Sequence, residues 1–288
     1  MNARTSILRS IASNWPFENG SGRFLDSVAS QCDLGRGEVD CLTSDGFKMR
    51  VFADDLIGRH ILMSGKFDRS TVAALADFAE RGDVILDVGA NIGYVSCLLL
   101  TLIPDSVAYC VEPQPDVAAL LRRNVGQFGE ARAHVLEAAL SDEDAELPMR
   151  IDDQNRGRSS LDRPSEGRTI MIPAVSTDRY LAGFERVDLV KIDVEGHEVR
   201  LFENASAQLA RLQPRAVLFE SEGAEAAPAG RIAAVLDGAG YDVFGLKKSL
   251  LATTLRPIRS AEDCDCNDYI AVSRSRALPA KARARLGR

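Results

Sequence analysis

The sequence lacks any run of eighteen apolar residues, the length at which a segment becomes a candidate to cross a membrane. Its first residues also lack the apolar core of a secretory signal peptide. Its six cysteines contain no C-x-x-C pair, so the zinc and redox motifs with that spacing are absent. From these absences we expect a cytoplasmic protein with reduced thiols and no transmembrane segment.

Basic residues are scarce except at the carboxyl end. The 288 residues carry a formal net charge of −7 at pH 7, yet residues 274–288 hold six basic residues and no acidic one. The rest of the chain has 29 basic and 42 acidic residues, a net charge of −13. An acidic body repels phosphate, which disfavours a nucleic-acid partner. We expect the basic tail to be a solvated end, partly helical or disordered.

The central pattern of the sequence is a strand, a glycine turn and a helix in direct succession. Residues 84–88 are apolar apart from Asp87, as expected of a parallel strand covered on both faces. Gly89 permits a sharp turn, and Gly93 permits close approach of a ligand or of another backbone segment. Apolar residues at helical spacing predict a helix over residues 94–102. A helix that begins at the carboxyl end of a parallel strand is a typical cofactor site.

The spacing of this turn differs from that of a dinucleotide-binding motif. Asn91 stands where G-x-G-x-x-G has its second glycine, and a carboxylate precedes the turn. That carboxylate would repel a pyrophosphate but not an ammonium or a sulfonium. The next predicted strand, residues 107–112, ends in Glu112, which can accept both hydroxyls of a ribose. The pattern predicts S-adenosylmethionine rather than NAD as the cofactor, bound through Asp87, Gly89, Asn91, Gly93 and Glu112.

Four strings resemble the FkbM family of S-adenosylmethionine-dependent methyltransferases: DVGANIGYVS, VEPQP, RSSL and DLVKIDVEGHE. The resemblance covers roughly residues 70–223. It implies a class I methyltransferase (Rossmann-like) α/β fold, whose doubly wound, mostly parallel seven-stranded sheet has the order 3-2-1-4-5-7-6 and only its last strand antiparallel. It also implies O-methylation of a small molecule, mainly a sugar of a glycolipid, polysaccharide or glycosylated metabolite. The alternatives are a polyketide or macrolide hydroxyl, an NAD-binding oxidoreductase and a catalytically silent protein.

The chain divides into three predicted parts. Residues 1–69 are expected to form a small helix and hairpin extension, with an Asp-Gly turn between the strands. Residues 70–273 alternate strands and helices as the methyltransferase domain requires, and residues 274–288 form the basic tail. The extension could cover the cofactor site, serve only for packing or form an oligomer surface. The oligomeric state stays open.

Two polar stretches are candidates for ligand binding. By resemblance, the loop after the predicted strand 133–137 lies against the adenine, with Ser141 and Asp142 as partners of its exocyclic amine; an ordinary polar turn is the alternative. Residues 152–169 are too polar to pack a core, so they predict a surface loop. We expect this loop to bind substrate through Ser159 and Ser160 and to be mobile without acceptor; a disordered insert is the alternative.

The expected strand ends converge on one crevice with four carboxylates: Asp87, Glu112, Asp193 and Glu220. Methyl transfer requires an acceptor hydroxyl to be aligned and its proton removed. His197 is the first candidate for the base, because imidazole titrates near neutral pH. The alternatives give that role to Asp193, or have Asp193 and Glu195 hold a divalent cation, although no H-x-E or D-x-D spacing among these strand-end carboxylates declares a metal. In a further alternative His197 simply faces solvent. Where no cation is bound, we expect Glu195 to contact the substrate.

Overall fold

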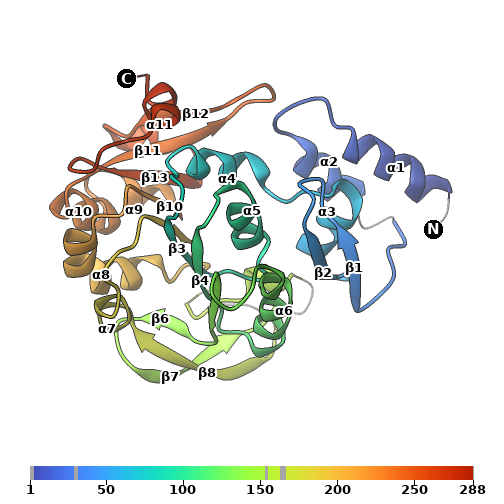
Figure 1. Cartoon of the computed structure of the whole chain (residues 1–288), viewed down its shortest axis with the longest axis horizontal. Helices are drawn as coiled ribbons and strands as arrows, with labels where there is room; N and C mark the ends of the chain where they lie inside the picture. The colour runs from blue at the N-terminus through green and yellow to red at the C-terminus, as the bar shows by residue number, and fades with distance from the viewer. Residues whose placement is uncertain (1–2, 29–31, 153–154, 163–166, 288) are drawn as a thin grey trace.

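The computed structural model describes residues 3–28, 32–152, 155–162 and 167–287. Figure 1 shows a central sheet with helices on both sides and the first helices of the chain set to one side of it. None of the described helices is both long enough and apolar enough to cross a membrane.

The central sheet has the strand order β12-β11-β13-β10-β9-β3-β4-β5. The strands from β10 to β5 run parallel, β13 is antiparallel to both of its neighbours, and β12 is antiparallel to β11. These strands are β3 (Val84–Val88), β4 (Val107–Val111), β5 (Ala133–Leu136), β9 (Leu189–Ile192), β10 (Ala216–Glu220), β11 (Tyr241–Lys248), β12 (Thr253–Pro257) and β13 (Asp268–Ser273).

The predicted order 3-2-1-4-5-7-6 is present, but the sheet has eight strands rather than seven. The additional strand is β12, which pairs along the outer edge of β11 and places Leu255 opposite Leu246. Two strands, β12 and β13, therefore oppose the parallel set, where the sequence led us to expect one. The extra strand forms because β11 runs on to Lys248 and offers a long unpaired edge.

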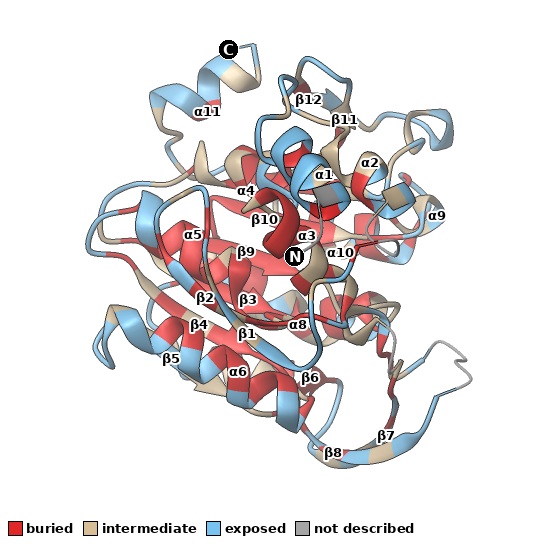
Figure 2. Cartoon of the chain, turned by 90° about the vertical axis from the view of Figure 1, so that its right-hand side faces the viewer, coloured by how far each residue is buried: buried red, intermediate tan, exposed pale blue. Residues whose placement is uncertain are grey.

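Alternating side chains of the strands build one core on each face of the sheet. Ile85 belongs to the core cluster that includes residues of α5 and α6, whereas Leu86 and Val88 belong to the cluster that includes residues of α8 and α10. In Figure 2 the strands are buried between helices whose inner sides are also buried. The helices are α4 (Arg69–Ala76), α5 (Tyr94–Leu102), α6 (Pro115–Val125), α7 (Thr177–Ala182), α8 (Glu198–Leu212), α9 (Gly223–Ala226) and α10 (Arg231–Gly238).

The predicted hairpin is confirmed, and a polar side chain connects it to the glycine turn. Strands β1 (Glu38–Leu42) and β2 (Lys48–Phe52) pair antiparallel. The side-chain amide of Asn124, on α6, accepts from the backbone N–H of Arg50 and donates to the carbonyls of Arg50 and Ile92. The helices of this part are α1 (Ala3–Ser13), α2 (Ser21–Val28) and α3 (Leu56–Ser64). The extension is thereby held against the domain close to the expected cofactor site.

A second small sheet lies beyond β5. Its order is β6-β8-β7, with β6 (Ala139–Ser141), β7 (Ala145–Arg150) and β8 (Thr169–Ser176). The segment 155–162 starts with a short 3₁₀ turn, Arg156–Arg158, and continues to a backbone pairing between Ser160 and Arg150. Of the polar stretch 152–169, the described segment 155–162 lies over the carboxyl ends of the central strands.

The basic tail packs on the body of the protein within residues 274–287. The guanidinium of Arg276 lies 2.9 Å from the buried carboxylate of Asp188, and Arg285 pairs with Asp77. Ala282, in the short helix α11 (Ala280–Arg285), is fully buried. Several of the tail's positive charges thus neutralise acidic groups of the domain, which accounts for the uneven distribution of charge in the sequence.

Candidate active site

A cavity of about 320 Å³ lies at the carboxyl ends of β3, β4, β9 and β10. This volume is within the range of small-molecule sites in proteins. Its walls come from the glycine turn, the strand ends, residues 138–140, the segment 155–161 and the amino-terminal residues Leu56, Ile57 and Phe67. One cavity therefore reaches both the end of β4, where Glu112 lies, and the end of β9, where Asp193 lies.

The glycine turn is built so that two strand ends touch. Gly89 has a φ of 73°, and a Cβ atom there would lie 1.8 Å from the carbonyl oxygen of Asp193. Lys191 joins the same two segments, because its ammonium donates to the Gly89 carbonyl at 2.7 Å and lies 3.2 Å from a carboxylate oxygen of Asp193. The close approach of the turns after β3 and β9 explains why glycine is required at position 89.

Two of the predicted cofactor residues lie behind the cavity wall. The fully buried carboxylate of Asp87 accepts a hydrogen bond of 2.5 Å from the Ser96 hydroxyl and lies 3.6 Å from the Lys191 ammonium. Gly93 starts α5, and a Cβ atom there would lie 2.7 Å from the side chain of Leu121. Neither residue is among those that line the cavity. Asp87 and Gly93 thus serve to pack α5 against its neighbours. The expected contact of Asp87 with the cofactor does not fit this placement, because Asp87 does not line the cavity.

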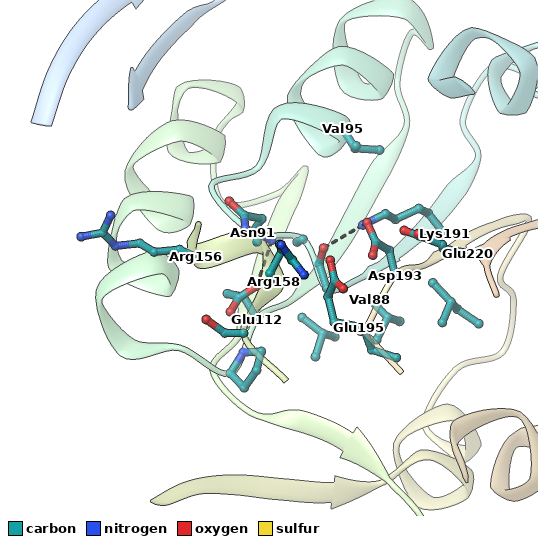
Figure 3. A pocket seen from close by; sticks show the side chains of 18 of the residues that line it. Val88, Asn91, Val95, Glu112, Arg156, Arg158, Lys191, Asp193, Glu195 and Glu220 are labelled. Atoms are coloured by element: carbon teal, nitrogen blue, oxygen red, sulfur yellow. Dashed lines mark hydrogen bonds and ion pairs between the residues drawn. The ribbon is translucent and has the colours of Figure 1, made fainter. Parts of the chain in front are cut away.

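Glu112, Asn91 and Gln114 form one wall of the cavity, seen with Glu112 and Asn91 in Figure 3. The Glu112 carboxylate accepts from the backbone N–H groups of Gln114 at 2.9 Å and of Asn91 at 3.0 Å. Burial raises the pKa of Glu112 to about 7. The buried Oε1 atom of Gln114 has no hydrogen-bond partner among the described residues. Each carboxylate oxygen and this amide oxygen can still accept a hydrogen bond, as the hydroxyls and amine of an adenosine would require.

The opposite wall of the cavity is acidic. Oxygens of Asp193, Glu195 and Glu220 lie within 4.8 Å of one another, and Figure 3 shows their side chains gathered near Lys191. Burial raises the pKa of Glu220 to about 8, and the charges of Asp193 and Glu195 add to the effect. Three carboxylates at this spacing could hold a divalent cation, but an acidic group alone does not define a metal site. These residues are suited to accept hydrogen bonds from hydroxyl groups.

The position of His197 fits neither the expectation that it is the base nor the expectation that it faces solvent. The ring is only 2% exposed, so it does not face solvent. Its Nδ1 atom lies 2.6 Å from a carboxylate oxygen of Asp162, and its Nε2 atom lies 2.9 Å from the Ser141 hydroxyl. The ring borders the cavity, yet neither nitrogen is left to receive a proton from a substrate. This geometry argues against His197 as the base.

Ser141 and Asp142 lie outside the cavity lining. Ser141 is fully buried, and its hydroxyl bonds to the Asp142 carboxylate at 2.8 Å as well as to His197. The exposed Asp142 lies 3.6 Å from the guanidinium of Arg200. The adenine contact expected of Ser141 and Asp142 does not fit this placement, because the residues of this loop that border the cavity are the preceding ones, 138–140.

Ser159 and Ser160 hold the loop on which they lie. Ser159 is 5% exposed and accepts from the backbone N–H of Asp152 at 3.1 Å, while Ser160 is 1% exposed and donates to the carbonyl of Glu195 at 2.5 Å. Ser159 lines the cavity and Ser160 does not. Residues 153–154 and 163–166 of the predicted loop 152–169 lie outside the described part of the chain. Its mobility therefore stays a prediction.

Some residues of the site were not identified from the sequence. In Figure 3 Arg158 extends into the space between Glu112 and Glu195, whereas Arg156 points away from it. Lys191 was missed although a signal was present, because a lysine inside a buried strand needs a charged partner. The contributions of Leu56 and Phe67 had no local signal, since they depend on how the extension packs.

Several known proteins are similar to part of this chain. The 2-O-methyltransferase NoeI of Sinorhizobium fredii is 28% identical over 170 residues, which is 52% of this chain and 67% of that protein. The hexuronic acid methyltransferase AglP of Haloferax volcanii is 25% identical over 144 residues, 49% of this chain and 58% of that protein. A crystal structure described as methyltransferase FkbM from Methylobacillus flagellatus KT aligns with 66% of this chain and 43% of its own, at 14% identity and a TM-score of 0.42.

The family comparison covers the site itself. The model of the methyltransferase FkbM domain matches residues 87–243, more than half of the 288 residues. The match begins at the end of β3 and includes the turns after β4, β9 and β10. The chain belongs to the FkbM family of methyltransferases.

Proposed function

We propose that this protein transfers a methyl group from S-adenosylmethionine to a hydroxyl of a small molecule, namely a sugar of a glycolipid, polysaccharide or glycosylated metabolite. One observation carries the proposal: a single cavity joins the hydrogen-bond acceptors around Glu112 to the acidic group around Asp193. The printed functions of the two relatives, a 2-O-methyltransferase and a hexuronic acid methyltransferase, support the sugar acceptor.

The wall around Glu112 fits the cofactor. Glu112 would accept hydrogen bonds from the ribose hydroxyls, and the orphaned oxygen of Gln114 would accept a further one. Residues 138–140 would pack against the adenine, and Asn91 and Gly89 would border the remainder of the cofactor. When bound, the cofactor supplies a methyl group that is already activated for displacement.

The acidic wall fits the acceptor. The Asp193 side chain lies 3.2 Å from the ammonium of Lys191 at the edge of the cavity, where it can align a hydroxyl and take its proton. Glu195 can accept hydrogen bonds from neighbouring hydroxyls of a sugar. Because both ring nitrogens of His197 have partners, a carboxylate is the proton acceptor in this scheme.

The three-part division of the chain belongs to the same proposal. Leu56, Ile57 and Phe67 of the extension 1–69 border the cavity. Apolar side chains at this edge would exclude water from the transfer and limit which acceptors enter. The extension is thus part of the cavity wall in the proposed function.

Calorimetry with S-adenosylmethionine and with NAD, in parallel, tests the cofactor. We expect binding of the first only; binding of NAD alone would favour an oxidoreductase. Transfer of a labelled methyl group to a panel of neutral sugars, uronic acids, glycolipids and macrolides tests the acceptor. Transfer only to a macrolide would overturn the sugar acceptor and keep the methyltransferase.

A further inference from the structure

A line of hydrogen bonds connects three segments beside the cavity. Asp162 belongs to the described loop segment 155–162, His197 follows the turn after β9, and Ser141 ends β6. The distances are 2.6 Å from Asp162 to Nδ1 and 2.9 Å from Nε2 to the Ser141 hydroxyl. Asp162 is exposed, whereas His197 and Ser141 are buried. The imidazole is thus the buried link between a surface loop and a core strand.

The direction of these bonds follows from their chemistry. An ionised Asp162 can only accept, so Nδ1 carries a hydrogen. Whether Nε2 donates to the Ser141 hydroxyl or accepts from it depends on the tautomer of the ring and on whether that hydroxyl donates to Asp142 at 2.8 Å. In both arrangements the ring donates to Asp162 and contacts Ser141. Neither arrangement directs a nitrogen to the acceptor.

The same loop segment holds the acidic wall directly. The Ser160 hydroxyl donates to the carbonyl of Glu195 at 2.5 Å. Glu195 has a φ of 53°, a left-handed conformation that a glutamate adopts at an energetic cost. On the other side of the turn, the Glu198 carboxylate accepts from the backbone N–H groups of Val194 and Gly196. The position of the Glu195 carboxylate therefore depends on contacts with the loop.

The loop has further attachments on the cofactor side. The backbone N–H of Arg156 donates to Asp55 at 2.8 Å, and its carbonyl accepts from the amide of Gln114 at 3.0 Å. These contacts do not involve His197. Loss of the contact between Asp162 and His197 should consequently release the end of the loop that lies over the acidic wall and leave the end beside Glu112 in place.

We infer that His197 is a positioning residue, which fixes the loop segment 155–162 to the turn that carries Asp193 and Glu195 and thereby shapes the acceptor site. This inference rests on the proposed function only for the identity of the acceptor. It gives the histidine of the KIDVEGHE string a role that does not require proton transfer. The reaction's proton goes to a carboxylate as described above.

Steady-state kinetics of loop variants test this role. Asp162→Ala removes the exposed partner and spares the buried ring, so the protein should fold. We expect the acceptor KM to rise by roughly ten- to hundredfold, the worth of one charge-assisted hydrogen bond, with kcat within about threefold of wild type and the affinity for S-adenosylmethionine unchanged. Asp162→Asn keeps an acceptor oxygen and should retain most of the wild-type KM. The control Glu143→Ala removes an exposed carboxylate next to Asp142 and should change nothing.

The His197 side of the contact is tested with two variants. His197→Asn keeps a donor near the position of Nδ1 and should resemble wild type, whereas His197→Gln should resemble Asp162→Ala. Combining His197→Gln with Asp162→Ala should then raise KM no further, because both remove one contact. Additive effects of the two changes would contradict a shared contact.

A fall in kcat with an unchanged acceptor KM in the His197 variants would make His197 part of the chemistry and overturn the inference. Trypsin cleavage after Arg158 gives a second readout that needs no acceptor. It should be faster in Asp162→Ala than in wild type or Glu143→Ala, and equal rates would also overturn the inference. If wild type showed no methyl transfer, the proposed function would fail while the cleavage comparison still tested the contact.

Discussion

The ammonium of Lys191 lies 3.2 Å from the Asp193 carboxylate, two residues further along the chain, and 3.6 Å from Asp87. Burial alone would lower the pKa of Lys191, but the two carboxylates outweigh it and raise the pKa. This one cation thus offsets the charge of both the buried wall residue and the acceptor-side residue. It links the packing of the glycine turn to the chemistry of the cavity.

Lys191→Met should therefore destabilise the protein. The substitution keeps the apolar stem but leaves the fully buried Asp87 without its ammonium, which costs about 3–5 kcal/mol when a buried pair is broken. Urea unfolding at neutral pH measures the effect. The exposed Lys281→Met serves as the control and should change the free energy of unfolding by less than about 0.5 kcal/mol. Equal stabilities would mean that Asp87 does not depend on Lys191.

Glu112 should control the affinity for S-adenosylmethionine. Glu112→Ala removes the hydrogen bonds to the ribose, of which a single one is worth about 1.5–3 kcal/mol, so calorimetry should show binding weakened by at least roughly ten- to hundredfold in a folded protein. Because burial raises the pKa of Glu112 to about 7, its carboxylate is protonated below that pH, and wild-type binding should weaken as the pH falls through 7. Glu112→Gln should lose this pH dependence. Unchanged affinity in both variants would remove the ribose assignment.

Glu220 should make the stability of the protein depend on pH. Its pKa is raised from an ordinary 4.5 to about 8, so the folded state keeps a proton that the unfolded state releases. The resulting penalty is absent below pH 4.5, grows as the pH rises from 4.5 to 8 and is complete above 8.

Glu220→Gln removes this titration and should raise Tm by roughly 5 °C at pH 9 while changing it little at pH 4. Thermal unfolding at both pH values measures the difference. The exposed Glu143→Gln is the matched control and should show no such difference between the two pH values. A loss of Tm at pH 9 in the Glu220 variant would show that the ionised carboxylate stabilises the fold.

The parts of the fold that the sequence predicted are those with strong apolar periodicity. Strand β3, helix α5 and the strand before the KIDVEGHE turn combine buried apolar runs with glycine turns, which few other structures accommodate. Strands β7 and β12 were missed because they lie at sheet edges, where polar residues and proline are tolerated; Pro148 and Pro257 lie in them.

The sequence predicted which strand ends form the candidate site, but not which side chains there point into the cavity. A single residue of register decides whether a side chain enters the cavity, and the burial of Ser141 and His197 depends on contacts with segments far away in the sequence. Asp162 gave no signal of its own, since an aspartate in a polar loop is ordinarily solvated. Long-range contacts of this kind cannot be deduced from spacing alone.

The closeness of the two strand ends gives the last prediction. Gly89 and Gly82 both have a positive φ, of 73° and 77°. A Cβ atom at position 82 would meet nothing within 4 Å, whereas one at position 89 would lie 1.8 Å from the Asp193 carbonyl oxygen. Gly82→Ala therefore carries only the left-handed strain of about 1–2 kcal/mol. Gly89→Ala carries the same strain and must also push the turn after β9 away.

We expect Gly89→Ala to be markedly less stable than Gly82→Ala in urea unfolding and, where it folds, to bind S-adenosylmethionine weakly and to lose methyl transfer. Gly82→Ala should keep wild-type binding and activity. Both variants place a side chain at a positive φ, but only Gly89→Ala also lacks space for a Cβ atom. The difference between the two variants therefore measures the need for space alone. Equal losses of stability would show that the turns after β3 and β9 separate at little cost, and that the junction of the two cavity walls is not fixed by this contact.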